Sequence, residues 1–224
     1  MLYIVATPIG NLEDITFRGL RILGQADYIL AEDTRKTARL LKHNNISKPL
    51  VSFFEHNELK KIPSVIKDLK QNKNIVLVSN AGTPAISDPG YKLIRECSKE
   101  NLPLTSIPGP SAPINALVLS ALASDKFIFL GFLPRKKSKA LLILKKAAQL
   151  KITTIIFESP FRTIKTLKNI QQEFKNPKVA VVREMTKLYE EVISADIQEV
   201  IARLEQKPLK GEVTIVINNS FVCP

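Results

Sequence analysis

The first half of this 224-residue chain alternates short apolar runs with segments of helical periodicity, and this alternation constrains the fold more than any other feature. The apolar runs are rich in β-branched residues, which favours buried strands. We expect strands at 2–7, 28–31, 50–54, 75–79 and 104–107, and helices at 17–23, 34–41, 62–70 and 91–98. The order βαβα is typical of a mostly parallel sheet with helices on both faces.

The second half is less regular and predicts a second sheet of mixed character. Pro108-Gly109-Pro110 interrupts the chain, and a helix is expected to follow at 111–122. Further strands are expected at 127–132, 153–158, 179–184, 191–194 and 212–218, with helices at 138–149, 161–174 and 197–204. Two of these strands follow each other without a helix between them, which favours antiparallel pairing. We therefore predict an α/β protein of two α/β domains, 1–115 and 116–224.

Positive charge is concentrated in one part of the chain. The net charge is +12, and residues 126–178 hold 13 Lys and Arg against two Glu, so this segment carries +11 and the rest of the chain +1. Such a distribution indicates a polyanionic partner, although a solubilising helix face is the alternative. Aromatic residues make up 6% of the chain and there is no Trp, which disfavours a stacking platform built from many aromatics.

Several classes of protein are disfavoured by what the sequence lacks. Two cysteines do not make a disulfide framework, and Met1-Leu-Tyr-Ile-Val lacks the charged start of a signal peptide. The apolar runs are shorter than a membrane span, so we expect a cytoplasmic protein without a membrane partner. We find no GxGxxG after a strand, no P-loop motif and no His/Cys spacing typical of a metal site, so no metal is expected.

Four turns follow expected strand ends, at 7–11, 32–35, 79–90 and 108–112. Ligands of open α/β sheets bind at the carboxyl ends of strands, so these turns are candidate binding loops. The turn at 79–90 is the most informative, because Gly82 permits a positive φ or a close backbone approach and the prolines stiffen the loop. A rigid loop with free amides suits an adenosine-type ligand. We also expect Ser87 or Asp88 to cap the next helix, with Pro89 at its first position.

Eight motifs occur in order along almost the whole chain: TPIGN, EDTR, SNAGTPAISDPG, PGPSA, GFLPRK, ESPFR, REMTKLYEE and KGE. Together they resemble the tetrapyrrole methylase superfamily, the class III methyltransferases. GFLPRK and REMTK are similar to the motifs of its small-subunit ribosomal RNA methyltransferase branch.

The resemblance implies two α/β domains with S-adenosylmethionine in the inter-domain cleft, usually in a homodimer. It implies methyl transfer to the 2′-oxygen of a cytidine in the decoding centre, so the partner is 16S ribosomal RNA or the small ribosomal subunit. Two alternatives remain open. One is a tetrapyrrole-ring methylase of the same superfamily. The other is a non-catalytic RNA-binding assembly factor, which a cofactor titration would distinguish from an enzyme.

Candidate site residues fall into three groups. The resemblance implies cofactor contacts at Pro8, Ile9, Gly10, Asn80, Ala81, Gly82, Thr83, Ser111, Ala112, Met185 and Thr214. Charged side chains near strand ends are candidates for catalysis or substrate orientation: Glu32, Asp33, Arg35, Glu158, Arg162, Arg183, Glu184 and Lys187. Phosphate contacts with RNA are expected at Arg135, Lys136, Lys137 and Lys139. The alternatives are core packing for Met185, β propensity for Thr214 and loop-holding ion pairs for several of the charged residues.

The sequence departs from the family pattern at three places. Many relatives have Asp where Asn80 stands, and Asn keeps an acceptor but loses the charge. Relatives of this branch commonly read ESxHR, and Phe161 replaces that His, so a His at this position is not an indispensable base here. Longer relatives continue after the KGE strand, and we expect RNA contacts of that extension to be missing.

Overall fold

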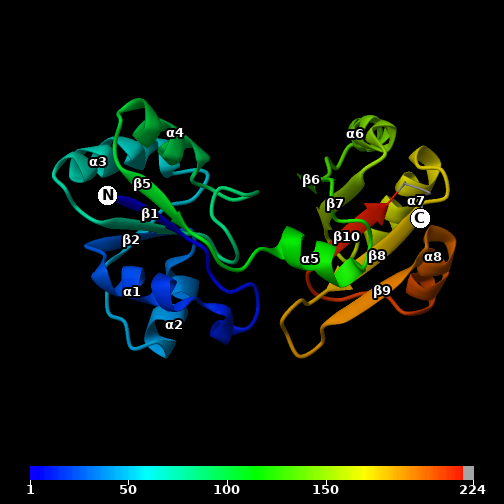
Figure 1. Cartoon of the computed structure of the whole chain (residues 1–224), viewed down its shortest axis with the longest axis horizontal. Helices are drawn as coiled ribbons and strands as arrows, with labels where there is room; N and C mark the ends of the chain where they lie inside the picture. The colour runs from blue at the N-terminus through cyan, green and yellow to red at the C-terminus, as the bar shows by residue number, and fades with distance from the viewer. Residues whose placement is uncertain (219–224) are drawn as a thin grey trace. The chain divides into compact units, whose positions relative to one another are not determined.

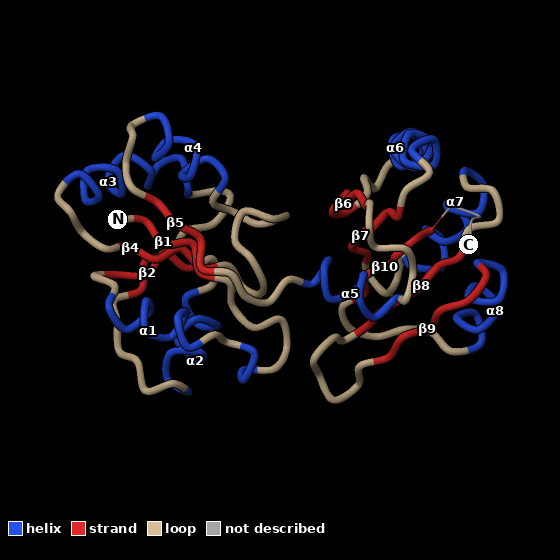
Figure 2. The backbone as a smooth tube through the Cα atoms, in the orientation of Figure 1, coloured by secondary structure: helices blue, strands red, loops and turns tan. Residues whose placement is uncertain are grey.

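The computed structural model describes residues 1–218, which fold as two compact units (Figure 1). The first unit is Met1–Ser111, and the second begins at Ala112. Each unit contains one five-stranded sheet with helices packed on it, as the tube in Figure 2 shows. The boundary expected after residue 115 falls within the first helix of the second unit.

The sheet of the first unit is parallel throughout, which confirms the prediction from the βαβα pattern. Its strand order is β3-β2-β4-β1-β5, and every neighbouring pair is parallel. The elements are β1 (Leu2–Val5), η1 (Leu12–Asp14), α1 (Phe17–Gln25), β2 (Tyr28–Ala31), α2 (Thr34–His43), β3 (Leu50–Ser52), α3 (Glu58–Lys70), β4 (Ile75–Val78), α4 (Tyr91–Lys99) and β5 (Leu104–Ile107).

Two apolar cores lie on opposite faces of this sheet. On one face, Ile22 and Leu23 of α1 and Leu41 of α2 pack against the strands. On the other face, Leu69 of α3 and Leu93 of α4 do the same. The alternation of side chains along each strand fills both cores, because successive residues point to opposite faces. Helices α1 and α2 therefore cover one face and α3 and α4 the other (Figure 1).

The second unit has the mixed sheet that was predicted. Its strand order is β6-β7-β10-β8-β9, with β6 and β7 parallel and the other neighbouring pairs antiparallel. The elements are α5 (Ala112–Ser120), β6 (Phe127–Phe132), α6 (Lys137–Leu150), β7 (Thr153–Glu158), α7 (Thr163–Glu173), β8 (Lys178–Arg183), β9 (Glu191–Asp196), α8 (Ile197–Gln206) and β10 (Val213–Asn218). The successive strands β8 and β9 pair antiparallel, as expected from the missing helix between them.

A single large core holds this second sheet to α6, α7 and α8. Leu144, Leu167 and Val200 come from these helices, and Ile156 and Ile215 face them from the sheet; all five are fully buried. Burial of each such side chain stabilises the folded state by about 1.5–3 kcal/mol relative to leaving it in water. Helix α5 packs on the sheet as well, against β7, β8, β9 and β10.

The prediction that Ser87 or Asp88 caps the helix after β4 is wrong. Helix α4 begins at Tyr91, and its N-cap is Gly90 with φ 126°, not Ser87 or Asp88. Ala85 and Ser87 adopt left-handed φ values of 69° and 63°, so the chain turns back on itself before a helix can start. The Ala85 amide donates to the Pro89 carbonyl across this turn, at 3.3 Å.

Candidate functional site

The connections of the first sheet indicate a candidate ligand site at the carboxyl end of β4. Strands β1 and β2 lead into helices on one face of the sheet, whereas β4 leads into α4 on the other face. Strand β4 lies between β2 and β1. On each side of β4, two neighbouring strands therefore connect to helices on opposite faces of the sheet. Ligands of open parallel sheets bind where connections diverge in this way.

Three of the predicted loops meet at this position. The backbones of Thr7 and Gly82 exchange two hydrogen bonds, of 2.9 and 2.8 Å, which join the loop after β1 to the loop after β4. The hydroxyl of Thr7 also donates to the carbonyl of Ser79, at 3.3 Å. Thr83 donates its hydroxyl to the carbonyl of Pro110 in the loop after β5, at 3.3 Å. The loops thus form one connected structure.

Gly82 adopts the positive φ that the sequence suggested. Its φ is +77°, a backbone conformation that favours glycine. A Cβ built there would lie 3.5 Å from Cγ2 of Ile9 and 3.7 Å from the carbonyl oxygen of Pro110, which are ordinary contacts. The backbone conformation therefore demands glycine more than crowding by these neighbours does.

Asn80 links the same loop to the loop after β2 and leaves an acceptor unused. Its backbone N–H donates to Oε2 of Glu32, at 3.1 Å. Its side-chain Oδ1 is buried and has no hydrogen-bond partner among residues 1–218. A buried polar atom without a partner costs about 1–3 kcal/mol. Oδ1 is consequently positioned to accept from a donor of a bound ligand.

Asp88 is a further candidate site residue, which was not predicted from the sequence. Burial raises its pKa to about 6, and the negative charge of Glu32 raises it further toward that value, while a hydrogen bond with Ser79 acts in the opposite direction. Asp88 was interpreted only as a helix cap, because local spacing does not reveal a carboxylate brought near from another loop. Among the groups with a perturbed pKa in these loops, it is the one that titrates closest to neutrality.

Asp33 and Arg35 lie at the start of α2 and bind each other. The Asp33 carboxylate caps the helix by accepting from the Arg35 amide at 2.9 Å, and it accepts from Nε and Nη2 of the same side chain at 3.1 and 2.9 Å. The hydrogen bonds from Arg35 lower the pKa of Asp33 to about 2. A structural role accounts for both charges, and their predicted part in catalysis stays a prediction.

In the second unit, Met185 lies between two residues with strained backbone. Glu184 and Thr186 have φ values of 49° and 64°, and left-handed φ is costly for a β-branched residue such as Thr. Met185 itself is 8% exposed. Strained residues of this kind cluster at ligand sites. The contact of Met185 with the cofactor stays a prediction.

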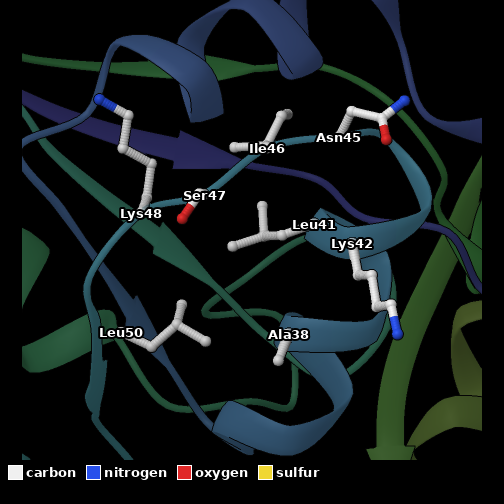
Figure 3. A pocket seen from close by; sticks show the side chains of 8 residues that line it. All are labelled: Ala38, Leu41, Lys42, Asn45, Ile46, Ser47, Lys48 and Leu50. Carbon is white, nitrogen blue, oxygen red and sulfur yellow. The ribbon is translucent and has the colours of Figure 1, made fainter.

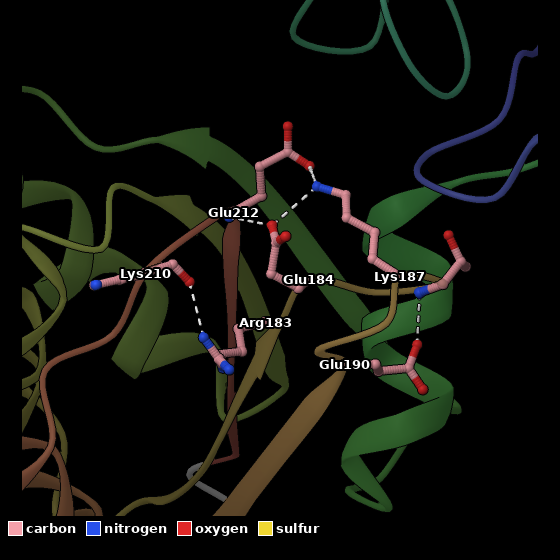
Figure 4. Close-up of polar contacts among 7 residues, drawn as sticks. Arg183, Glu184, Lys187, Glu190, Lys210 and Glu212 are labelled. Carbon is pink, nitrogen blue, oxygen red and sulfur yellow. Dashed lines mark hydrogen bonds and ion pairs between the residues drawn. The ribbon is translucent and has the colours of Figure 1, made fainter.

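The turn after β8 is held by a network of charges (Figure 4). Oε1 of Glu184 accepts from the Glu212 amide and from Nζ of Lys187, both at 2.9 Å. Nζ of Lys187 also donates to Oε2 of Glu212, at 2.9 Å. The Glu212 amide and then Lys187 lower the pKa of Glu184. Burial acts to lower the pKa of Lys187, but the hydrogen bonds to both carboxylates outweigh it and raise that pKa. Lys187 is therefore protonated at neutral pH.

The other candidate charges of the second unit also have partners. Arg183 donates from Nε to Oε2 of Glu191 at 2.8 Å and from Nη1 to the carbonyl of Lys210 at 3.1 Å. Both carboxylate oxygens of the buried Glu158 are used, by the Ser159 amide at 2.8 Å and by the hydroxyl of Thr166 at 2.6 Å.

Arg162 joins the ends of two neighbouring strands. Its Nε pairs with Glu158 at 3.4 Å, and its Nη2 donates to the carbonyl of Leu133 at 3.2 Å. Leu133 directly follows β6, and Glu158 ends β7. The structure thus brings Glu158 and Arg162 together as one pair and Glu184 and Lys187 as another.

The predicted RNA contacts are accessible and carry free charges. Arg135, Lys136, Lys137 and Lys139 are all exposed, and their side chains form no ion pair with any residue the structure describes. They surround the N-terminus of α6, whose first turn contains no acidic residue. Cations are unfavourable at this end of a helix, and an anion bound there would relieve the repulsion.

The remaining predicted contacts lie where the loops and strands carry them. Ile9 is 8% exposed and Thr214, on β10, is 3% exposed. The others are partly or fully accessible: Pro8, Gly10, Ala81, Ser111 and Ala112. Their role toward the cofactor stays a prediction.

A separate hollow of ≈ 440 Å³ lies at the opposite edge of the first sheet (Figure 3). Leu41, Ile46 and Leu50 form its apolar part, and Lys42 and Lys48 line it as well. Its lining residues lie from α2 to the start of β3, so the hollow is at the amino ends of the strands. The loops after β1 and β4 lie at the carboxyl ends. A position at the amino ends does not favour a ligand site in an open parallel sheet.

Residues 1–218 lack the side-chain groups of a metal site and the helices of a membrane span. They contain no group of three or more His, Cys, Asp or Glu side chains that could hold a metal ion. No helix in this range is long and apolar enough to cross a membrane.

Comparison with known proteins decides the family. A model described as Tetrapyrrole (Corrin/Porphyrin) Methylases matches residues 1–201. The chain belongs to this family. Among the tetrapyrrole methylases, the chain falls in the branch whose members are named Ribosomal RNA small subunit methyltransferase I. Such a protein from Thermotoga maritima is 46% identical over 217 residues, 97% of each chain. Another from Halalkalibacterium halodurans is 43% identical over 98% of this chain and 76% of the relative.

Solved structures of other tetrapyrrole methylases share the fold. A cobalt precorrin-4 methyltransferase of cobalamin biosynthesis aligns with a TM-score of 0.71 at 18% identity, over 97% of this chain and 94% of that one. Uroporphyrin-III C-methyltransferase from Thermus thermophilus, complexed with S-adenyl homocysteine, aligns with a TM-score of 0.67 at 15% identity, over 96% of each. These likenesses confirm the two-domain α/β architecture.

Proposed function

We propose that this protein transfers a methyl group from S-adenosylmethionine to small-subunit ribosomal RNA, at the 2′-oxygen of a cytidine in the decoding centre of 16S RNA. The observation that carries the proposal is the connected loop structure at the carboxyl end of β4, which offers a rigid backbone and an unused acceptor. The 46% identity to a protein named for small-subunit RNA methylation supports the choice of substrate.

The residues of this edge fit a cofactor with polar donors. Oδ1 of Asn80 lacks a partner among the described residues and can accept from such a donor, while Gly82 keeps the backbone accessible. Ile9 offers an apolar contact beside Gly82. Asn80, Gly82, Thr83 and Ile9 are the residues that we assign to cofactor binding in the first unit. When bound, S-adenosylmethionine supplies a methyl group on a sulfonium sulfur.

The chain must also orient the acceptor hydroxyl and take up its proton. A ribose hydroxyl is a poor nucleophile, so a nearby acceptor with a pKa close to neutral assists the reaction. Asp88 has a pKa raised to about 6 by burial and by Glu32, and it is therefore mostly ionised at pH 7. We assign proton acceptance to this carboxylate, ahead of Glu158 and Glu184, whose oxygens are held by other groups.

RNA binding is assigned to the exposed cations at the start of α6. Arg135, Lys136, Lys137 and Lys139 have no acidic partner among the described residues and so remain available for phosphates. They contribute four of the 13 positive charges in the basic segment. Phosphate contacts of this kind would position the RNA without specifying its sequence.

A tetrapyrrole-ring methylase is the second candidate, because the solved structures that share the fold are named for such substrates. Their identity of 15–18% supports the fold alone. Tetrapyrrole substrates such as uroporphyrinogen carry several carboxylates, so the net charge of +11 over residues 126–178 does not by itself separate the two candidates; the 46% identity to a protein named for small-subunit RNA methylation favours RNA. Methylation of a tetrapyrrole would therefore contradict the proposal, and the test includes such a substrate.

The test compares substrates directly with the purified protein and labelled S-adenosylmethionine. Assembled small subunits, naked 16S RNA and a uroporphyrinogen substrate are each incubated with the protein, and ribose methylation is mapped in the RNA. We expect 2′-O-methylation of a decoding-centre cytidine that a Gly82→Val variant fails to produce. Methylation of a base, of another nucleotide or of the tetrapyrrole would overturn the assignment. Absence of cofactor binding in calorimetry would favour a non-catalytic assembly factor.

A further inference from the structure

A β-bulge in β6 brings two phenylalanines to the same face of the second sheet. Phe129 pairs with Ile155, and Phe132 pairs with Phe157, so β6 contains one more residue than β7 between these pairs. Phe132 lies three positions after Phe129, and a regular strand would point the two side chains to opposite faces. Gly131, with φ 63°, lies within the bulge and allows the extra residue.

The bulge creates a cluster of three aromatic rings. Phe157 lies 4.9 Å from Phe129 and 5.4 Å from Phe132, measured between ring centroids. Ile156 belongs to the core under α6, α7 and α8, so its neighbour Phe157 points to the other face. Phe132 is 62% exposed, although its ring is supported by Phe157. An exposed aromatic ring on a supported base is a surface suited to stacking.

A fourth ring lies at the same edge of the sheet. Phe161 follows β7 by three residues and is 95% exposed. Strands β6 and β7 are parallel neighbours, so Phe132 and Phe161 both lie at the carboxyl ends of these strands. Arg162 holds the two ends together through Glu158 and the Leu133 carbonyl. Five of the ten phenylalanines lie on β6, on β7 or directly after β7.

The surroundings of these rings are basic. Arg135, Lys136 and Lys137 follow Phe132 within five residues, and their charges have no partner among the described residues. Lysine is depleted in protein interfaces, whereas exposed aromatics next to unpaired cations are typical of surfaces that bind single-stranded nucleic acid. Charge complementarity therefore favours an RNA strand over a second protein as the occupant.

We propose that Phe132 and Phe161 form a stacking platform for unpaired nucleobases of single-stranded RNA, with the adjacent cations contacting its phosphates. The inference rests on the proposed function, because it assigns part of the same RNA substrate to these rings. The sequence disfavoured a platform built from many aromatic residues. The proposed platform needs only a few rings, which the bulge and the parallel pairing of β6 and β7 bring together. Duplex RNA, whose bases are already stacked, is not a ligand of this surface.

The experiment measures binding of a fluorescein-labelled single-stranded RNA of about twelve nucleotides, within the range of common site sizes, and of a duplex of the same length. Phe132→Ala and Phe161→Ala are compared with the wild type, with Phe132→Trp as the conservative variant. Phe17→Ala is the matched control, because Phe17 is 93% exposed but lies on α1 in the first unit. Salt dependence, S-adenosyl homocysteine affinity and molar mass are recorded for each protein.

We expect Phe132→Ala and Phe161→Ala each to weaken single-strand binding by between about 5-fold and about 100-fold, the loss carried by one base–aromatic stack. Phe132→Trp and Phe17→Ala should keep the affinity, and the salt slope should be unchanged, because no phosphate contact is removed. Equal affinity of the alanine variants and the wild type would overturn the platform. Conversion of a dimer to a monomer by Phe132→Ala, with RNA affinity intact, would overturn it in favour of self-association.

Failure of the platform and failure of the proposed function are separable in the same set of proteins. Wild-type methylation of the 16S RNA with unchanged affinity in the two alanine variants removes the platform alone. A wild-type protein that binds no RNA and methylates none removes both. Phe161→Ala guards against misfolding as an explanation, because a side chain that is 95% exposed contributes little to packing.

Discussion

Replacing Asp88 by Asn should stabilise the protein, and the gain should appear only as the pH rises. Burial and the charge of Glu32 raise the pKa of Asp88 from 3.8 to about 6. A carboxyl with a raised pKa favours the fold in its neutral form, so its contribution is complete below about pH 4 and is lost as the pH rises to about 6. The amide of the variant cannot ionise and keeps that contribution at every pH.

The magnitude follows from the size of the pKa change. About two units correspond to about 3 kcal/mol at 1.4 kcal/mol per unit. The carboxyl is only half-buried, so solvent screening reduces this figure to about 1–1.5 kcal/mol. The variant should therefore gain about 1–1.5 kcal/mol over the wild type between about pH 4 and pH 8.

The assay is urea denaturation of both proteins across this pH range. The quantity of interest is the change of their stability difference with pH, since any constant effect of the amide cancels. Asp125→Asn is the matched control, because Asp125 is exposed in a loop of the second unit. In a Glu32→Gln background the gain should shrink, because that charge is the second cause of the raised pKa. A stability difference that is flat, or that falls with rising pH, would refute the reasoning.

Thr154→Val should be neutral or stabilising by about 1 kcal/mol, because the Thr154 hydroxyl is fully buried without a partner among the described residues; thermal unfolding measures it. Leu144→Ala should cost about 2–5 kcal/mol in urea denaturation, because Leu144 is fully buried in the second core. Gly82→Ala should weaken S-adenosyl homocysteine binding in calorimetry and cost about 1–2 kcal/mol of stability, because alanine is strained at a φ of +77°. Neutralising the four cations at 135–139 should lower the log–log salt slope of RNA binding by roughly 0.7 to 0.9 per lost phosphate contact, without changing cofactor affinity. Light scattering should give the mass of the homodimer that the resemblance to the family implies; a monomeric mass would contradict that expectation.

The sequence predicted the regular elements well, because their signals are local. The ranges expected for β2, β5, β6 and β7 coincide with the observed strands, and the helices differ from expectation mainly at their ends. Helix α3 begins at Glu58 and not at residue 62 as expected, and it contains Pro63. Periodicity also separated the parallel first sheet from the mixed second one.

The candidate site was harder to predict, because its geometry depends on contacts between distant segments. The motifs located the loops that meet at β4, and Gly82 could be assigned from its conformational freedom. Asp88 was missed because its environment is set by Glu32 in another loop. The bulge at Phe129 and Phe132 was missed, although the single glycine inside FIFLGF, Gly131, is a signal that often marks a bulge in a strand.

The connected loops at β4 also make the proposed cofactor site a late product of folding. Their contacts join residues that are far apart along the chain: 72 residues for Thr7 and Ser79, 48 for Asn80 and Glu32, and 27 for Thr83 and Pro110. Contacts of such separation form slowly, since long segments of chain must be ordered before they close. A nascent chain cannot complete this edge until Pro110 has been synthesised and all five strands have paired. With the cofactor at the proposed site, its binding reports that the first unit is fully folded, and a mutation that destabilises this sheet is expected to weaken that binding.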